Sequence, residues 1–129
     1  MLAPIKIQQL NIDLQEIQGL DSRQIIKHKL LEALKHQKGQ FIIDDSSLYL
    51  KCFDYKLPGP LVKWFNMAIG DSGYAKLVKH MGENLAKAQT IIGYVDYAGA
   101  MLFFEGAMNG KIVRPRGSYS FGYDPVFYA

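Results

Sequence analysis

Apolar residues recur with a helical period in the stretch from residue 21 to residue 37. They stand three or four positions apart, as on one face of an amphipathic helix: Ile26, Leu30, Ala33 and Leu34. Asp21 or Ser22 can cap the start of this helix, and Gly39 follows its end. At about 100° per residue, Lys29 lies about 60° to one side of the apolar stripe. Its side chain is therefore expected to leave the helix along the packed surface.

Shorter apolar runs predict strands. We expect strands at residues 41–43 and 48–53, and a pair of strands at 88–97 and 100–106 around the turn at residues 97–99. Asn109-Gly110 is typical of a tight turn before a further strand at 111–113. Pro60 is placed to begin a short helix to residue 68, and residues 72–81 predict another helix. The pattern predicts an α/β fold.

Composition narrows the class of protein. A chain of 129 residues with 49% hydrophobic and 21% charged residues is typical of one soluble globular domain, spanning residues 1–129. A net charge of +3 suits anionic small molecules and is too small to indicate nucleic acid. Cys52 is the only cysteine, which fits a reducing cytoplasm and gives little support for a cysteine nucleophile. No apolar run approaches the ~20 residues of a membrane span.

The first candidate site is the acidic pair Asp44-Asp45, which directly follows the apolar run at 41–43. Successive strand residues point to opposite faces, so only one of the two carboxylates can face a given pocket. A carboxylate beside a core is costly unless it is paired or metal-bound, although Asp before Ser is also common in solvated turns. Glu16 reads as a loop acid that could join Asp45 in holding Mg²⁺, which takes oxygen ligands.

The second candidate site is the segment 118–125, where Gly122 separates two aromatic residues. Phe121, Tyr123 and Asp124 could grip a flat polar ring, although both aromatic side chains could equally belong to the core. Lys29 and Lys63 are the phosphate-binding candidates, because each belongs to an element that leads into or out of the acidic strand.

With these motifs in order, the chain resembles the inosine triphosphate pyrophosphatase family. The strings LPGPLVKWF at 57–65 and SFGYDP at 120–125 carry the resemblance, together with segments 12–19 and 42–48. The resemblance implies a long, mixed, twisted sheet with flanking helices. It also implies hydrolysis that depends on Mg²⁺, with Mn²⁺ as an alternative to Mg²⁺. The substrates would be non-standard purine nucleoside triphosphates of the ITP and XTP type, cleaved to monophosphate and pyrophosphate.

The resemblance also assigns roles to the candidate residues. Glu16 would help to hold the metal, and Asp45 would hold the metal or activate the attacking water. Asp44, by the alternation of strand residues, would cap the next turn or support the site from outside the metal ligands. Lys29 would contact the triphosphate, and Lys63 stays a phosphate-binding candidate through its position alone. The base would be stacked and hydrogen-bonded by three residues of the second site: Phe121, Tyr123 and Asp124.

The sequence departs from the family pattern at three places. It has no serine- or threonine-glycine-asparagine loop near its start and no serine-histidine-arginine motif after residue 125, and Ser47 stands where glycine or cysteine is common. A non-catalytic nucleotide-binding or self-associating relative is therefore the alternative function, and we expect weak or absent catalysis. Uncovered sheet surface would favour a homodimer or higher oligomer.

Overall fold

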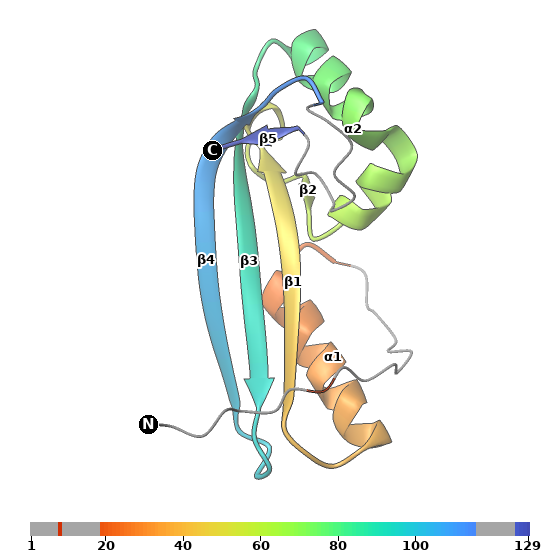
Figure 1. Ribbon diagram of the computed structural model, residues 1–129, viewed down its shortest axis with the longest axis vertical. Helices are drawn as coiled ribbons and strands as arrows, with labels where there is room; N and C mark the ends of the chain where they lie inside the picture. The colour runs from red at the N-terminus through yellow and green to blue at the C-terminus, as the bar shows by residue number, and fades with distance from the viewer. Residues whose placement is uncertain (1–7, 9–18, 116–125) are drawn as a thin grey trace.

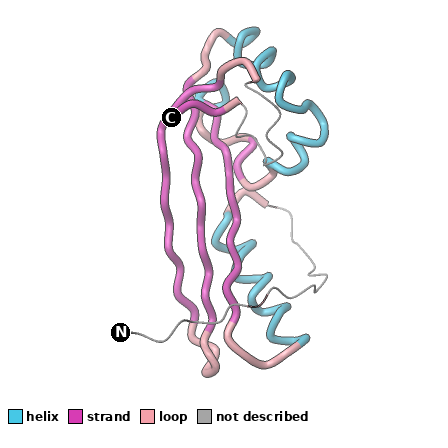
Figure 2. The backbone as a smooth tube through the Cα atoms, in the orientation of Figure 1, coloured by secondary structure: helices cyan, strands magenta, loops and turns pink. Residues whose placement is uncertain are grey.

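A five-stranded sheet with helices near its two ends forms the fold. The computed structural model describes residues 8, 19–115 and 126–129. The strand order is β2-β1-β3-β4-β5. Three strands are long and two are short: β1 (Phe41–Leu50), β3 (Leu85–Val95) and β4 (Met101–Ile112), then β2 (Pro58–Gly59) and β5 (Phe127–Tyr128). The long strands form the spine of the molecule, with α1 and α2 towards its opposite ends (Figures 1 and 2).

The strand β1 is continuous, so the prediction of two strands at 41–43 and 48–53 is wrong. Its ladder with β3 runs without a break from Phe41 opposite Val95 to Leu50 opposite Ala86. The polar residues in the middle do not interrupt it, because their backbone groups stay in the ladder and the Ser46 hydroxyl lies 3.3 Å from the Thr90 hydroxyl. After the strand, η1 (Lys51–Phe53) forms a single 3₁₀ turn.

The helix α1 (Ser22–His36) confirms the sequence prediction. The Asp21 carboxylate caps it by accepting hydrogen bonds from the backbone N–H groups of Arg23 and Gln24, at 3.0 and 3.4 Å. Its apolar stripe packs on β1 and β3 and forms what we call the α1 cluster. The buried members are Ile26, Leu30, Ile91 and Val95, and the half-buried members include Phe41, Ile43 and Phe103.

The helix α2 (Val62–Met81) joins the two helices predicted after Pro60. Gly70 interrupts it with a φ of 63° and a ψ of −178°, and this kink separates the two predicted halves. Glycine tolerates this left-handed φ without a Cβ clash. Both halves pack on the other end of the sheet and contribute to the α2 cluster: Leu48, Leu50, Val62, Tyr74, Val78, Ala86, Ile112 and Val126.

The two clusters lie on opposite faces of one sheet. Side chains alternate between faces along a strand. On β1 the α1 cluster takes the odd-numbered Phe41 and Ile43, whereas the α2 cluster takes the even-numbered Leu48 and Leu50. Residues between these two sets, including the acidic pair, lie where β1 passes from one cluster to the other.

Two further expectations are corrected. Asn109-Gly110 makes no turn but lies inside β4, because Gly110 is needed where β5 crosses: a Cβ there would meet the backbone of Tyr128 and the ring of Phe127. The resemblance implied a mixed sheet, but every pairing among the described strands is antiparallel. The α/β fold with flanking helices is confirmed. No helix in the described part of the chain is long and apolar enough to span a membrane.

Candidate functional site

Asp45 lies in the middle of β1, not at a strand end as predicted. It pairs with Ile91 of β3, so its side chain points to the face that α1 covers. Asp45 is half-buried and its Oδ2 atom is shielded from solvent. Asp44 is exposed on the opposite face. The two carboxylates therefore face different sides of the sheet, as the alternation of strand residues predicted.

Lys29 belongs to the same face of the molecule as Asp45. Ser22, at the start of α1, lies against Ser47 of β1, where their hydroxyl oxygens are 3.2 Å apart. Lys29 is seven residues further along α1, on the same side of the helix to within about 20° and about 10 Å along its axis. The helix α1 and the strand β1 run in opposite directions, so a step forward along α1 corresponds to a step backward along β1. Asp45 lies two residues before Ser47, about 7 Å back along the strand. The half-buried Lys29 thus comes to about the level of Asp45.

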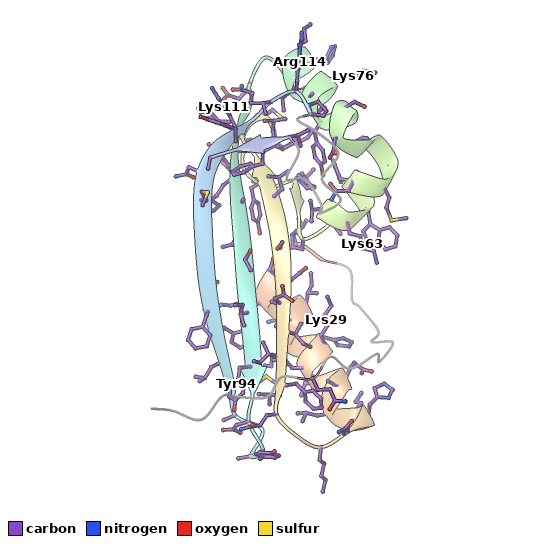
Figure 3. All side chains as sticks on the ribbon, in the orientation of Figure 1. Lys29, Lys63, Lys76, Tyr94, Lys111 and Arg114 are labelled. Carbon is purple, nitrogen blue, oxygen red and sulfur yellow. The ribbon has the colours of Figure 1, made fainter. Side chains whose placement is uncertain are left out.

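Lys63 comes from the other helix and is exposed. It is the second residue of α2, which follows β2, and β2 pairs with Leu48 and Tyr49 of β1, only a few residues past Asp45. Its Nζ atom lies 5.4 Å from the centroid of the Trp64 ring. Figure 3 shows Lys29 on α1 and Lys63 on the end of α2 nearest to α1, whereas Lys76, Lys111 and Arg114 lie at the far end of the sheet.

The remaining predicted site residues lie outside the described part of the chain. These are the candidate metal ligand and the candidate base-binding residues: Glu16, Phe121, Tyr123 and Asp124. Their roles stay predictions. A cavity of about 340 Å³ between the second half of α2 and the end of β4 includes none of the predicted site residues; Lys79, Glu83 and Arg114 are among those that line it.

The residues present suit a hard metal ion. The described residues contain no group of three His, Cys, Asp or Glu side chains that could hold a metal by themselves. Mg²⁺ usually needs only one or two protein carboxylates and completes its shell with water and substrate phosphates. The half-buried Asp45 carboxylate, with one oxygen shielded from bulk water, is such a donor.

Cys52 does not behave as an activated nucleophile. Burial in the α2 cluster raises the pKa of the Cys52 thiol, and the nearby Glu83 carboxylate raises it further. A thiol is nucleophilic as its thiolate, so a raised pKa disfavours reaction. This agrees with the sequence analysis, which placed the chemistry on the carboxylates.

Sequence reasoning missed the buried contact between Ser22 and Ser47. Ser22 was considered only as a possible helix cap, and Ser47 only as a departure from the family pattern. Twenty-five positions separate them, and no local pattern connects two serines at that distance along the chain. Their proximity depends on the packing of α1 on β1.

Comparison with known proteins decides the family. The sequence pattern of the Ham1 family matches residues 1–129, the whole chain. The chain belongs to the Ham1 family. Inosine triphosphate pyrophosphatase 1 of Trypanosoma cruzi is 36% identical over 126 residues, which are 95% of this chain and 63% of that protein. Inosine triphosphate pyrophosphatase of Schizosaccharomyces pombe is 34% identical over 123 residues, covering 95% of this chain and 64% of that protein.

Solved structures of Ham1 family proteins share the fold. A nucleoside-triphosphatase, described as a dITP/XTP pyrophosphatase, from Mycobacterium abscessus matches with a TM-score of 0.70 and 25% identity over 92% of this chain and 66% of that one. The Ham1 protein of Staphylococcus aureus gives the same TM-score and identity over 92% of this chain and 64% of that one. This Ham1 family chain thus spans slightly less than two thirds of the length of the curated relatives named above.

Proposed function

We propose that this chain hydrolyses non-standard purine nucleoside triphosphates, of the ITP and XTP type, to a monophosphate and pyrophosphate. Family membership and the names of the relatives give the class of reaction. The single observation that carries the proposal is the placement of Asp45, a half-buried carboxylate on the α1 face at about the level of Lys29. A carboxylate and a cation so arranged suit a water nucleophile and an anionic substrate.

In the proposed reaction, Asp45 orients a water molecule and accepts a proton from it as the water oxygen bonds to the α-phosphorus. The bond between the α- and β-phosphates breaks, and pyrophosphate leaves with the bonding electron pair. Lys29 and Lys63 offset the negative charge of the phosphate chain. Bound Mg²⁺ or Mn²⁺, held by Asp45 and Glu16, would neutralise phosphate charge and lower the pKa of a coordinated water.

We extend the proposal to the base. Phe121 and Tyr123 would stack on the purine, as aromatic platforms do for other bases. Asp124 and backbone groups of the same segment would hydrogen-bond a ring that carries a 6-keto group. An adenine amino group would leave some of these polar groups without a partner, which costs affinity. The preferred substrates are therefore inosine and xanthosine triphosphates.

The test is pyrophosphate release from inosine triphosphate and from adenosine triphosphate, each with Mg²⁺ and with excess chelator. We expect release from inosine triphosphate with the metal, at least about tenfold slower release from adenosine triphosphate, since unpaired polar groups cost 1–3 kcal/mol, and none with chelator. Equal rates for the two nucleotides, or a rate that chelator leaves unchanged, would contradict the proposal. Nucleotide binding without turnover would support the non-catalytic alternative.

We also propose that the chain forms a homodimer. We propose the cytoplasm as its compartment, as its lone cysteine predicts. Five large apolar side chains share the sheet face opposite α1, which we call the outer face. They are 40% to 58% exposed: Ile42, Ile92, Leu102, Phe104 and Met108. Asp44 is the one charged side chain that the three long strands place on this face among the described residues. Interface cores have this composition, apolar and depleted of charge, and a second copy offers a self-complementary partner.

Substitution of Phe104 tests the dimer. Phe104→Asp should weaken self-association at least about tenfold, because a carboxylate would be buried without a partner. Light scattering across a concentration series should give a mass near twice 14.6 kDa for the unchanged chain and 14.6 kDa for the variant. The control is Tyr97→Asp, at the 79% exposed tip between β3 and β4. An unchanged chain that stays monomeric at high concentration would exclude the homodimer.

A further inference from the structure

The hydrogen bond between Ser22 and Ser47 joins the first residue of α1 to the middle of β1 in the interior. The two hydroxyl oxygens are 3.2 Å apart, and the residues are only 5% and 2% exposed. They are the buried polar residues among those described. A hydrogen bond at such a depth is directional and fixes the relative position of the groups that make it.

The other contacts of α1 leave its position along β1 less defined. Ile26 and Leu30 pack on the sheet, and apolar contact is non-directional. Arg23 forms an ion pair with Glu105 at 3.1 Å, but both side chains are about half exposed, at 57% and 43%, and such surface pairs contribute little. The serine pair is therefore a buried directional contact inside this packing.

Each serine shares its face with one residue of the proposed site. Ser47 and Asp45 are two positions apart on β1, so both point towards α1. Ser22 and Lys29 are two helical turns apart on one side of α1. A shift of α1 along β1 would displace Lys29 along the strand relative to Asp45 by the amount of the shift.

We propose that Ser22 and Ser47 are positioning residues, whose hydrogen bond sets the register of α1 on β1 and so places Lys29 relative to Asp45. The inference rests on the proposed function, since it assumes that Asp45 and Lys29 act on one substrate. It predicts that the pair affects turnover more than it affects substrate binding. Misplacement of reacting groups by about 1 Å can cost on the order of 100-fold in rate.

The test compares kcat, KM and the thermal unfolding midpoint for hydrolysis of inosine triphosphate with Mg²⁺. Ser22→Ala and Ser47→Ala should each lower kcat about tenfold with KM within about twofold of the unchanged chain. Ser22→Thr, which keeps a hydroxyl, should retain most of kcat. Assays run well below each variant's unfolding midpoint report on folded protein only.

Ser46→Ala is the matched control. Ser46 is the neighbouring residue on β1, and its hydroxyl pairs with that of Thr90 at 3.3 Å, but on the face away from α1. Its loss removes a serine hydroxyl and an exposed hydrogen bond of similar length, and should leave kcat unchanged. If the unchanged chain is active and both alanine variants keep its kcat, or if Ser46→Ala loses as much, the positioning role is overturned while the proposed function stands. An inactive unchanged chain overturns both. If Ser47→Ala does not fold, the comparison of Ser22→Ala with Ser22→Thr decides.

Discussion

Asp45→Asn is expected to reduce pyrophosphate release from inosine triphosphate at least about 100-fold, because proton transfer by a positioned side chain contributes about 10²–10⁴-fold. Asparagine has nearly the same shape as aspartate but cannot accept the proton of the attacking water at neutral pH. It is also a poorer ligand for a divalent cation. The side chain keeps its place in β1, so circular dichroism and the thermal unfolding midpoint should change little.

The neighbouring acid provides the control for this substitution. Asp44→Asn removes the same charge one residue earlier, from an exposed position on the opposite face of β1. Turnover should stay within about twofold, since Asp44 lies on the face of the sheet opposite Asp45 and α1. Substantial turnover by Asp45→Asn, or an equal loss in Asp44→Asn, would place the chemistry elsewhere.

The second large effect concerns stability. Gly93 lies in β3 directly beneath α1, and a Cβ added there would overlap Ile26 and come within 3.1 Å of Leu30. Gly93→Ala should therefore force α1 away from the sheet and lower the free energy of unfolding by about 2 kcal/mol, as overpacked cores do. For a domain of this size the thermal unfolding midpoint should fall by roughly 10 °C. Calorimetry or a circular dichroism melt measures this directly.

Gly106 is the matched control in the adjacent strand. It lies in β4, and an added Cβ would meet no atom within 4 Å. Gly106→Ala should leave the midpoint unchanged or raise it slightly, because glycine in a strand loses more backbone entropy than alanine. A similar loss in both variants would show that the effect comes from the loss of glycine itself and not from contact with α1.

The elements with a clear hydrophobic period were predictable from the sequence. The period of α1 and its cap at Asp21 matched the structure closely, and so did the pairing of the strands around residues 97–99. These features depend on local chemistry that a short window of sequence contains. The pair β3 and β4 extends beyond its predicted limits, because strand ends depend on what lies beside them.

The errors arose where packing overrides local preference. Residues 44–47 look like a turn, yet they continue β1, since this stretch passes between the two clusters and its serine hydroxyls find partners on α1 and β3. Asn109-Gly110 favours a hairpin in isolation, but β5 requires a residue without a side chain at Gly110. The partners of the β1 serines and the strand β5 beside Gly110 are distant in the sequence, so no local pattern could reveal these contacts.

The same limit applies to the candidate site. The alternation of strand residues correctly separated Asp44 from Asp45, and the helical angle of Lys29 correctly placed it at the edge of the packed surface. The level of α1 along β1 could not be predicted, because it involves contacts such as that between Ser22 and Ser47, which are 25 positions apart in the sequence. Motifs thus predicted which residues form a site, and the fold was needed to relate the positions of Asp45 and Lys29 along β1.

The opposite-faced clusters also protect the chain against errors of strand alignment. If β1 slipped by one residue against β3, every side chain of β1 would exchange faces. Ile43 would leave α1 at the same moment as Leu48 left α2, so one slip would dismantle both cores. The packing of α1 and α2 on opposite faces thus fixes the register of this long strand.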